Sequence, residues 1–295
     1  MKTPLDGDAV TVRFFMPSPR LAPYVSTYYL TEVNLPEGET LQDSLHPEWG
    51  NLRFTRNDQW HVGIGNQPLQ AAPNFIASGP TCHCAHFKTG PTRIWGVGIL
   101  PVGWARFFDT PVAAYADSYC DGASEPAFAA LAPLLGTVFT GASNPAGEAA
   151  LIDAFLLDYL SARPPHEDEP RIRAAHAALI DTEINSVGDF AARLGISSRS
   201  LERLSLRAFG FSPKLLLRRQ RFLRSLAQFM LDPSLTWVST LDCHYVDQAH
   251  FVRDFKRFMG MSPSTYAALD HPVLRAAARA RAAAAGEAVQ ALHRP

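Results

Sequence analysis

The chain has 295 residues, of which 47% are hydrophobic, and a formal net charge of −1 at pH 7. At roughly 150 residues per domain, this length predicts two domains that each bury a core. Four cysteines do not form a disulfide framework in a chain this long, and the apolar run 94–108, interrupted by Pro101 and Arg106, is shorter than the roughly 20 residues of a membrane span. The first residues lack the apolar core of a secretory signal, so we expect a cytoplasmic protein with no membrane segment.

Charge is divided unevenly along the chain. Residues 1–170 contain 9 Lys and Arg against 18 Asp and Glu, a net of −9, whereas residues 171–266 contain 14 against 8, a net of +6. A basic C-terminal segment suits a polyanion such as double-stranded DNA, and an acidic N-terminal segment does not. The pattern predicts one DNA-binding domain and one domain with another function.

The first 110 residues are rich in Pro, Gly, aromatic and β-branched residues in short runs, which predict strands. The runs are 10–15, 24–30, 51–54, 61–64 and 94–100. Many short strands separated by turn signals predict a β-sandwich or barrel. A small molecule bound inside this domain would occupy an apolar pocket lined by aromatic residues, although the same residues would also suit a packed core. The candidates are Trp49, Phe54, Trp60, Trp95 and Trp104.

A cysteine-rich segment, 81–86, offers an alternative function. Cys82, Cys84 and His86 would share one face of a strand, because side chains alternate there, and such ligands could hold zinc or copper in a metal- or thiol-responsive protein. A small buried cysteine face is the other interpretation, and we predict no metal and no other cofactor. The chain also lacks a phosphate loop, a Gly-x-Ser-x-Gly elbow and a His-Glu-x-x-His helix, so we do not expect an enzyme.

Beyond residue 102 the apolar residues recur at helical spacing, which predicts helices over 104–108, 125–139 and 145–162. Their apolar stripes would pack against the β domain or form a homodimer surface. The proline-rich, charged segment 163–170 is the predicted linker. Residues 1–162 are therefore assigned to an effector-binding and dimerisation domain.

A helix-turn-helix is predicted from residue 187 to 204. The apolar positions fit two short helices with one core, Gly195 turns the chain between them, and Ser197 caps the second helix. The second helix of such a unit can enter the major groove of DNA.

The skeleton of this unit repeats fifty residues later. Leu201, Arg203, Gly210 and the pair Ser212-Pro213 correspond to Phe251, Arg253, Gly260 and Ser262-Pro263 without a gap. Each copy is an amphipathic helix that ends at a glycine, followed by a Ser-Pro start for another helix, and Asp247 would cap the second copy. The repeat predicts two similar helical units in one chain.

The paired Gly-x-Ser-Pro segments and the run 247–256 resemble the C-terminal domain of AraC-type bacterial transcription regulators over residues 171–266. The resemblance implies an all-α domain of two helix-turn-helix units joined by a long helix, in an α+β chain. A weaker resemblance, at 47–54, 78–80 and 96–103, is to the cupin-like sensor half of some of these regulators. The chain departs from the family at His244-Tyr245, where Gly-Phe or Gly-Tyr is usual, at Ser205, which replaces an aromatic, and in a helix over 237–243 that is about one residue short.

The family pattern identifies the side chains that would read bases, because Arg, Gln and small apolar groups match base edges in the major groove. They are Ser198, Arg199, Glu202 and Arg203 in the first unit and Gln248, Ala249, Val252 and Arg253 in the second. Phosphate contacts, which set position and not sequence, are expected from a second group of basic residues. These are Arg218, Arg219, Arg221, Arg224, Lys256 and Arg257.

The resemblance therefore implies a sequence-specific, DNA-binding transcription regulator that senses a small-molecule effector and contacts RNA polymerase. The alternatives are a version that responds to metal or thiol oxidation through Cys82, Cys84 and His86, and an enzyme fused to a DNA-binding module. The alanine-rich tail, 267–295, is interpreted as a marginal helix or a disordered segment without an assigned role.

Overall fold

The computed structural model describes residues 9–56, 59–140, 143–232, 235–237 and 239–295. Residues 1–8, which carried part of the expectation of a cytoplasmic protein, lie outside these ranges. In the ranges described, no helix is long and apolar enough to cross a membrane.

The N-terminal half contains two antiparallel sheets. The larger sheet has the strand order β1-β2-β9-β4-β7-β10, and the smaller has the order β3-β8-β5-β6. The strands of the larger sheet are β1 (Val10–Phe15), β2 (Val25–Val33), β9 (Thr92–Ile99), β4 (Gly50–Thr55), β7 (Phe75–Ser78) and β10 (Tyr119–Asp121). Those of the smaller sheet are β3 (Leu41–Leu45), β8 (Ala85–Thr89), β5 (His61–Ile64) and β6 (Gln70–Ala71). The predicted strands are confirmed, and the sheets form a sandwich.

Apolar side chains hold the two sheets together. Ile76 and Ile94 of the larger sheet share one buried cluster with Val62 and Phe87 of the smaller sheet and with Trp60, which directly precedes β5. Inward and outward side chains alternate along a strand, so one face of each sheet can contribute to this cluster.

The other face of the larger sheet is covered by helices α1 (Pro101–Phe107), α2 (Pro133–Thr137) and α3 (Pro145–Ser161). Ile152 and Leu156 of α3 pack in the same cluster as Trp95 and Val97 of β9. The apolar stripes therefore pack against the β domain. The helix expected over 125–139 is broken into a short 3-10 turn (Ala129–Leu131) and α2, with a proline at the first helical position of α2, where a missing N–H costs nothing.

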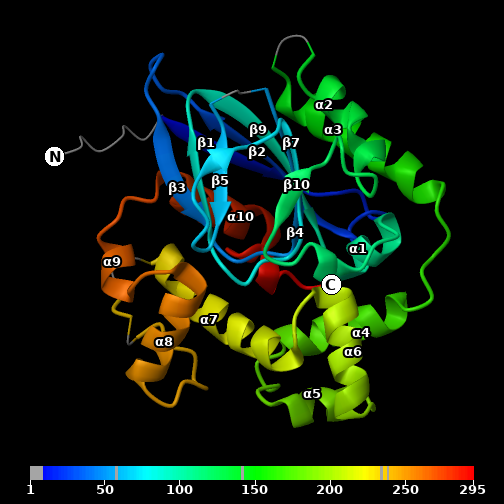
Figure 1. Cartoon of the computed structure of the whole chain (residues 1–295), viewed down its shortest axis with the longest axis vertical. Helices are drawn as coiled ribbons and strands as arrows, with labels where there is room; N and C mark the ends of the chain where they lie inside the picture. The colour runs from blue at the N-terminus through cyan, green and yellow to red at the C-terminus, as the bar shows by residue number, and fades with distance from the viewer. Residues whose placement is uncertain (1–8, 57–58, 141–142, 233–234, 238) are drawn as a thin grey trace.

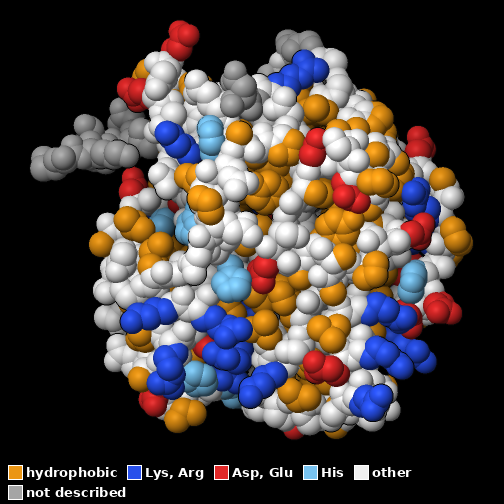
Figure 2. Space-filling model, in the orientation of Figure 1, with side chains coloured by type: hydrophobic (Ala, Val, Ile, Leu, Met, Phe, Trp, Pro, Cys, Tyr) orange, Lys and Arg blue, Asp and Glu red, His pale blue; other side chains and the backbone are white. Residues whose placement is uncertain are grey.

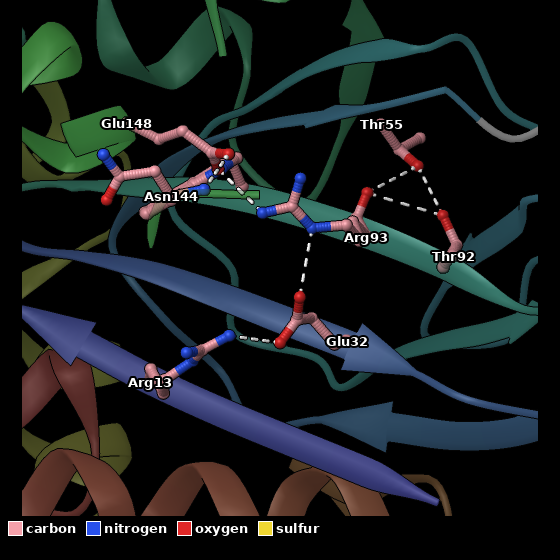
Figure 3. Close-up of polar contacts among 8 residues, drawn as sticks. Arg13, Glu32, Thr55, Thr92, Arg93, Asn144 and Glu148 are labelled. Atoms are coloured by element: carbon pink, nitrogen blue, oxygen red, sulfur yellow. Dashed lines mark hydrogen bonds and ion pairs between the residues drawn. The ribbon is translucent and has the colours of Figure 1, made fainter. Parts of the chain in front are cut away.

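A chain of ion pairs also ties α3 to the sheet (Figure 3). Glu32 of β2 pairs with Arg13 of β1 and with Arg93 of β9, whose Nη2 lies 2.8 Å from the Glu148 carboxylate of α3. Trp95 Nε1 donates to the same carboxylate at 2.6 Å. Arg93 and Trp95 hold the pKa of Glu148 below its usual range, against the opposing effect of burial. This network crosses three strands and is structural.

The C-terminal half is helical. Its helices are α4 (Glu169–Ile180), α5 (Val187–Arg193), α6 (Ser198–Phe209), α7 (Pro213–Leu231), α8 (Gln248–Met259) and α9 (Pro263–Ala267). Helix α7 runs between the group α4, α5 and α6 and the group α8 and α9 (Figure 1). The predicted pair of units joined by a long helix is confirmed.

The two halves share a continuous core. Trp49, Cys82 and Leu100 of the β domain belong to the same buried cluster as Phe209 of α6 and Phe222 of α7. The end of the predicted linker takes part in this interface: Glu169 is only 8% exposed and accepts a hydrogen bond from Tyr24 Oη at 3.0 Å.

The alanine-rich tail is ordered and returns to the N-terminal half. Helix α10 (Pro272–Ala285) packs along β1, and a 3-10 turn (Gln290–Leu292) follows it. Of the two structural interpretations of the tail, the helix is therefore correct.

Candidate nucleic-acid interface

The first helix-turn-helix unit is built by local hydrogen bonds. Ser186 Oγ accepts from the N–H of Asp189 at 3.0 Å and caps α5, and Ser197 Oγ accepts from the N–H of Ser200 at 3.2 Å and caps α6. Gly195 has φ +63° in the turn between the helices, a conformation that glycine adopts without strain. Leu201 and Leu204 are buried, so the opposite face of α6 points to solvent.

All four side chains predicted to read bases in the first unit lie on that exposed face. They are Ser198, Arg199, Glu202 and Arg203. Arg207, one turn further, pairs with Asp168 instead.

The recognition helix of the second unit has the same construction. Asp247 Oδ1 accepts from the N–H of His250 at 2.6 Å, and α8 ends at Gly260, which has φ +71° as Gly210 at the end of α6 has φ +79°. Of the four residues predicted to read bases, three are exposed and Val252 is half-buried. The exposed three are Gln248, Ala249 and Arg253.

The support of this second helix differs from the prediction. The expected helix over 237–243 is replaced by turns in the residues that the structure describes there, which omit 238. The turns are held by Asp242, whose carboxylate pairs with Arg224 of α7 and accepts from the N–H of His244 at 3.0 Å. His244 Nε2 in turn lies 2.8 Å from the carbonyl oxygen of Thr182 in the first unit. The departure from the family at His244 thus coincides with a contact between the two units.

The basic residues predicted to contact phosphates have different surroundings. Lys256 and Arg257 are exposed, and Arg221 is half-buried with its guanidinium 5.6 Å from the centre of the Tyr245 ring. Arg218 and Arg224 are engaged with Asp254 and Asp242. Lys and Arg side chains gather over the helical half of the face shown in Figure 2.

The prediction that Arg219 contacts a phosphate is wrong. Arg219 is 0% exposed, donates from Nη1 to the carbonyl oxygen of Thr81 at 2.9 Å and lies 3.9 Å from the Trp49 ring centre. A side chain in this position cannot reach a phosphate. Arg219 follows Leu216 by three residues and precedes Leu223 by four, so helical spacing alone would have placed it on the buried face.

A cavity of about 110 Å³ lies in the N-terminal half and is lined by residues of both sheets and of the tail. Trp60 lines this cavity, but the other four predicted aromatic residues do not. Trp49 packs at the interface with Phe209 and His176, and the remaining three are in the core between the larger sheet and its helices. Those three are Phe54, Trp95 and Trp104. The sequence does not distinguish the aromatic residue that lines the cavity from those that pack in a core, because aromatic residues suit both places equally.

The cysteine segment lies at the interface between the two halves. Cys84 Sγ lies 3.3 Å from His86 Nε2 and donates to the carbonyl oxygen of Met259 at 3.3 Å. Burial raises the pKa of both Cys82 and Cys84 to about 12, so both thiols are protonated at neutral pH. Among the residues described, the ligand-type atoms that converge within 4.8 Å are those of Asp242, Cys243 and His244, where Asp242 is already paired.

Residues 190–268 match the family model described as a helix-turn-helix domain, and residues 13–121 match a domain of unknown function, DUF6597. No curated protein matches the chain.

Solved structures with a similar arrangement include ToxT from Vibrio cholerae, at 10% identity and a TM-score of 0.41 over 78% of this chain and 97% of that one. Another is ToxT from Vibrio cholerae O395 bound to (E)-4-(8-methylnaphthalen-1-yl)but-3-enoic acid, at 10% identity and a TM-score of 0.43 over 88% and 97%. The AraC-like transcriptional activator CuxR matches at 14% identity and a TM-score of 0.25 over 75% and 88%. With the two capped recognition helices and their joining helix, the family match establishes that residues 190–268 form an AraC-type helix-turn-helix domain.

Proposed function

We propose that the chain is a transcription regulator that reads double-stranded DNA through α6 and α8 and responds to a small-molecule effector bound in its N-terminal half. The observation that carries the DNA-binding part is the repetition of one recognition helix, with a side-chain cap at the same position and a glycine at the same end, at an offset of fifty residues. We assign the chain no catalytic activity.

The length of the joining helix supports simultaneous binding by both units. Helix α7 has 19 residues and is therefore roughly 28 Å long at 1.5 Å per residue. Successive major grooves on one side of a duplex are roughly 34 Å apart. With the flanking turns, α7 can hold α6 and α8 at adjacent grooves.

The proposed base contacts follow from exposure and chemistry. Arg199, Arg203 and Arg253 have donors that match guanine, and Gln248 matches adenine. Lys256 and Arg257 are exposed on the same helix as Gln248 and are assigned to phosphates, with Arg221 of α7. Arg218 and Arg224 would first have to leave their carboxylate partners, so their phosphate contacts depend on a rearrangement.

A single loop of the N-terminal half touches the C-terminal ends of both recognition helices, and this supports coupling to an effector. A Cβ atom at Gly210, after α6, would lie 3.2 Å from Pro80, and the N–H of Cys84 donates to the carbonyl oxygen of Phe258 in α8 at 2.8 Å. Between them, Thr81 accepts from Arg219 of α7. A shift of residues 80–84 would therefore change the relative position of α6 and α8.

RNA polymerase and a second copy of the chain are the further partners that we propose. Leu151 on the outer side of α3 is 47% exposed, while Ile152 and Leu156 on its inner side are buried. Helix α3 therefore offers an apolar contact to a second copy without disturbing the core.

Selection of binding sites from a random duplex pool by the full-length protein tests this proposal. We expect a bipartite site with two preferred blocks about 10 base pairs apart, and an affinity that falls steeply with salt. Recovery of sequences without any preference would contradict sequence-specific regulation, and a single block would contradict the participation of both units.

A further inference from the structure

The C-terminal tail is built into the N-terminal half by specific hydrogen bonds. The buried carboxylate of Asp43 in β3 accepts from His271 Nδ1 at 2.9 Å and from the N–H groups of Val273 and Leu274, each at 3.0 Å. At the other end of the tail, Gln290 Oε1 accepts from the N–H of Trp49 at 2.9 Å. Both ends of the tail are therefore fixed to the β domain.

The tail forms one wall of the cavity of about 110 Å³. Leu274, Ala278 and Val289 lie on the tail side, and apolar residues of both sheets, including Ile94 and Phe87, lie opposite. An apolar cavity of about 150 Å³ is known to hold benzene, so this volume suits an apolar group of about that size or smaller.

Arg281 of α10 also lines this cavity and is a buried cation that forms no ion pair with any residue that the structure describes. It is 5% exposed, and Nη1 donates to Thr27 Oγ1 at 2.6 Å. Its Nε has no hydrogen-bond partner in the described part of the chain. Burial lowers the pKa of Arg281 to about 10, so the guanidinium remains charged at neutral pH. His293 Nδ1, 3.4 Å from Nη2, belongs to a ring whose pKa burial and Arg281 lower to about 4, so it is neutral.

The acidic group that shares the cavity wall forms its contacts with residues other than Arg281. Glu48 pairs through Oε1 with Arg53 and accepts through Oε2 from Asn51 Nδ2 at 3.1 Å. Glu48 and Glu287 both favour the charged form of Arg281 through their charge, but neither forms an ion pair with it among the residues described. Since Arg53 and Glu48 balance each other, the cavity retains the positive charge of Arg281. A buried charge without a partner is costly and is compensated when a counter-ion binds.

We propose that the cavity binds a small organic acid whose carboxylate pairs with Arg281 and whose apolar body fills the space between Ile94, Phe87 and α10. A guanidinium that still has free donors matches a carboxylate, and apolar walls with a few placed polar groups are typical of ligand sites. This inference rests on the proposed effector-binding function and gives the effector a chemical class. It also makes the tail a part of the effector site.

The location of Arg281 gives the acid a direct route to the DNA-binding half. Helix α10 begins five residues after the end of α9, and the carbonyl oxygen of Ala291 accepts from Gln220 Nε2 of α7 at 2.7 Å. An acid bound at Arg281 would restrain the tail, which contacts the second unit at one end and α7 at the other.

Titration of the full-length protein with benzoate and hexanoate, and with the neutral benzamide and hexanamide, tests the proposal by calorimetry. We expect at least one acid to bind the wild type, and the matching amide and the Arg281→Met variant to bind about 10- to 100-fold more weakly, the loss typical of a charged hydrogen bond. Arg279→Gln, a change at an exposed position of the same helix, is the control and should bind like the wild type. Without an acid, Arg281→Met should melt at the same temperature as the wild type or higher, because it removes an uncompensated buried charge.

The proposal is overturned if neither acid binds the wild type, if the amides bind as tightly as the acids, or if Arg281→Met keeps full affinity. Should Arg281→Met fail to fold, Arg281→Lys and the comparison of acid with amide still decide the matter. DNA binding by the same preparations separates the two proposals. A protein that binds DNA but no acid refutes only this inference, whereas one that binds an acid but no DNA refutes the regulatory function.

Discussion

The first helix-turn-helix unit rests its recognition helix on a regular helix, α5, whereas the second rests its recognition helix on turns. Nevertheless, α6 and α8 have the same length, begin at a capping side chain and end at a glycine in the left-handed conformation. The recognition helices are therefore fixed by their own caps and apolar faces. The supporting segment can therefore change without altering the limits of the helix that it supports.

A second difference lies in the cores of the two units. Leu204 of α6 corresponds to Asp254 of α8, which is fully buried, pairs with Arg218 and accepts from Tyr245 Oη at 3.3 Å. The first unit thus has an apolar side chain where the second has a buried ion pair. Such pairs contribute little net stability but are costly to break, so the second unit should be the more sensitive to loss of a single polar group.

Asp242→Ala should cause the largest loss. The Asp242 side chain is 5% exposed and holds both Arg224 and the N–H of His244, and breaking a buried ion pair costs about 3 to 5 kcal/mol. In the first unit, Asp181 pairs with Arg193 at a more exposed site, so Asp181→Ala should cost much less. Urea unfolding of both variants measures the difference. If both variants lose the same free energy of unfolding, the second unit depends on polar contacts no more than the first unit does.

The glycines that end α6 and α8 share a left-handed backbone but differ in their surroundings. Gly210→Ala and Gly260→Ala both force an L-residue into the left-handed region, at about 1 to 2 kcal/mol each. At Gly210 the new Cβ would also lie 3.2 Å from Val112 and Ala116, whereas at Gly260 the nearest atom is 3.9 Å away. Gly210→Ala should therefore be the more destabilising in urea unfolding. Equal destabilisation would contradict the close contact between the first unit and the N-terminal half.

Each unit also meets the N-terminal half near a buried histidine, and the two histidines differ in their partners. His176, beside Phe209, has no hydrogen-bond partner for either ring nitrogen in the described chain, whereas His46 Nε2 lies 2.9 Å from Tyr266 Oη. Burial is the main cause that lowers the pKa of each to about 3.

In the unfolded chain the imidazole rings of both histidines are protonated near pH 6.5. In the folded chain they are not protonated until about pH 3. Each histidine therefore lowers the free energy of unfolding by up to about 1.4 kcal/mol per pH unit as the pH falls from 6.5 towards 3, and this penalty is absent above pH 6.5. His176→Leu should flatten this dependence. Urea unfolding at pH 7, 6 and 5 measures it, and an unchanged slope would show that His176 is protonated in the folded protein.

Arg221→Ala should have the smallest effect on affinity at any one salt concentration. It is assigned a phosphate contact beside the second unit, so its loss should weaken binding to all sequences alike and reduce the salt slope by about 0.9. Arg219→Gln is the matched control on α7, because the buried Arg219 should leave the slope unchanged. If Arg219→Gln lowers the slope as much, the domain interface opens when DNA binds.

Sequence predicted best what is determined locally. Ser197, Asp247 and the terminal glycines predicted the ends of α6 and α8, and the predicted strand at 61–64 coincides with β5. The pairing of strands and the position of the tail depend on contacts between distant segments, so no local sequence pattern could predict them. Arg281 could have been singled out only by its place on the apolar face of α10, seven residues after Leu274, a weak signal in an alanine-rich helix.

Binding-site selection with Arg203→Ala and Arg253→Ala tests the central claim, that both units read bases. Each variant should lose about 1 to 3 kcal/mol on the preferred site and relax the preference in one block only, with the two affected blocks about one helical turn apart. If Arg253→Ala retains both the preferred sequence and the affinity, α8 does not read bases through Arg253 and the account of two reading units is contradicted.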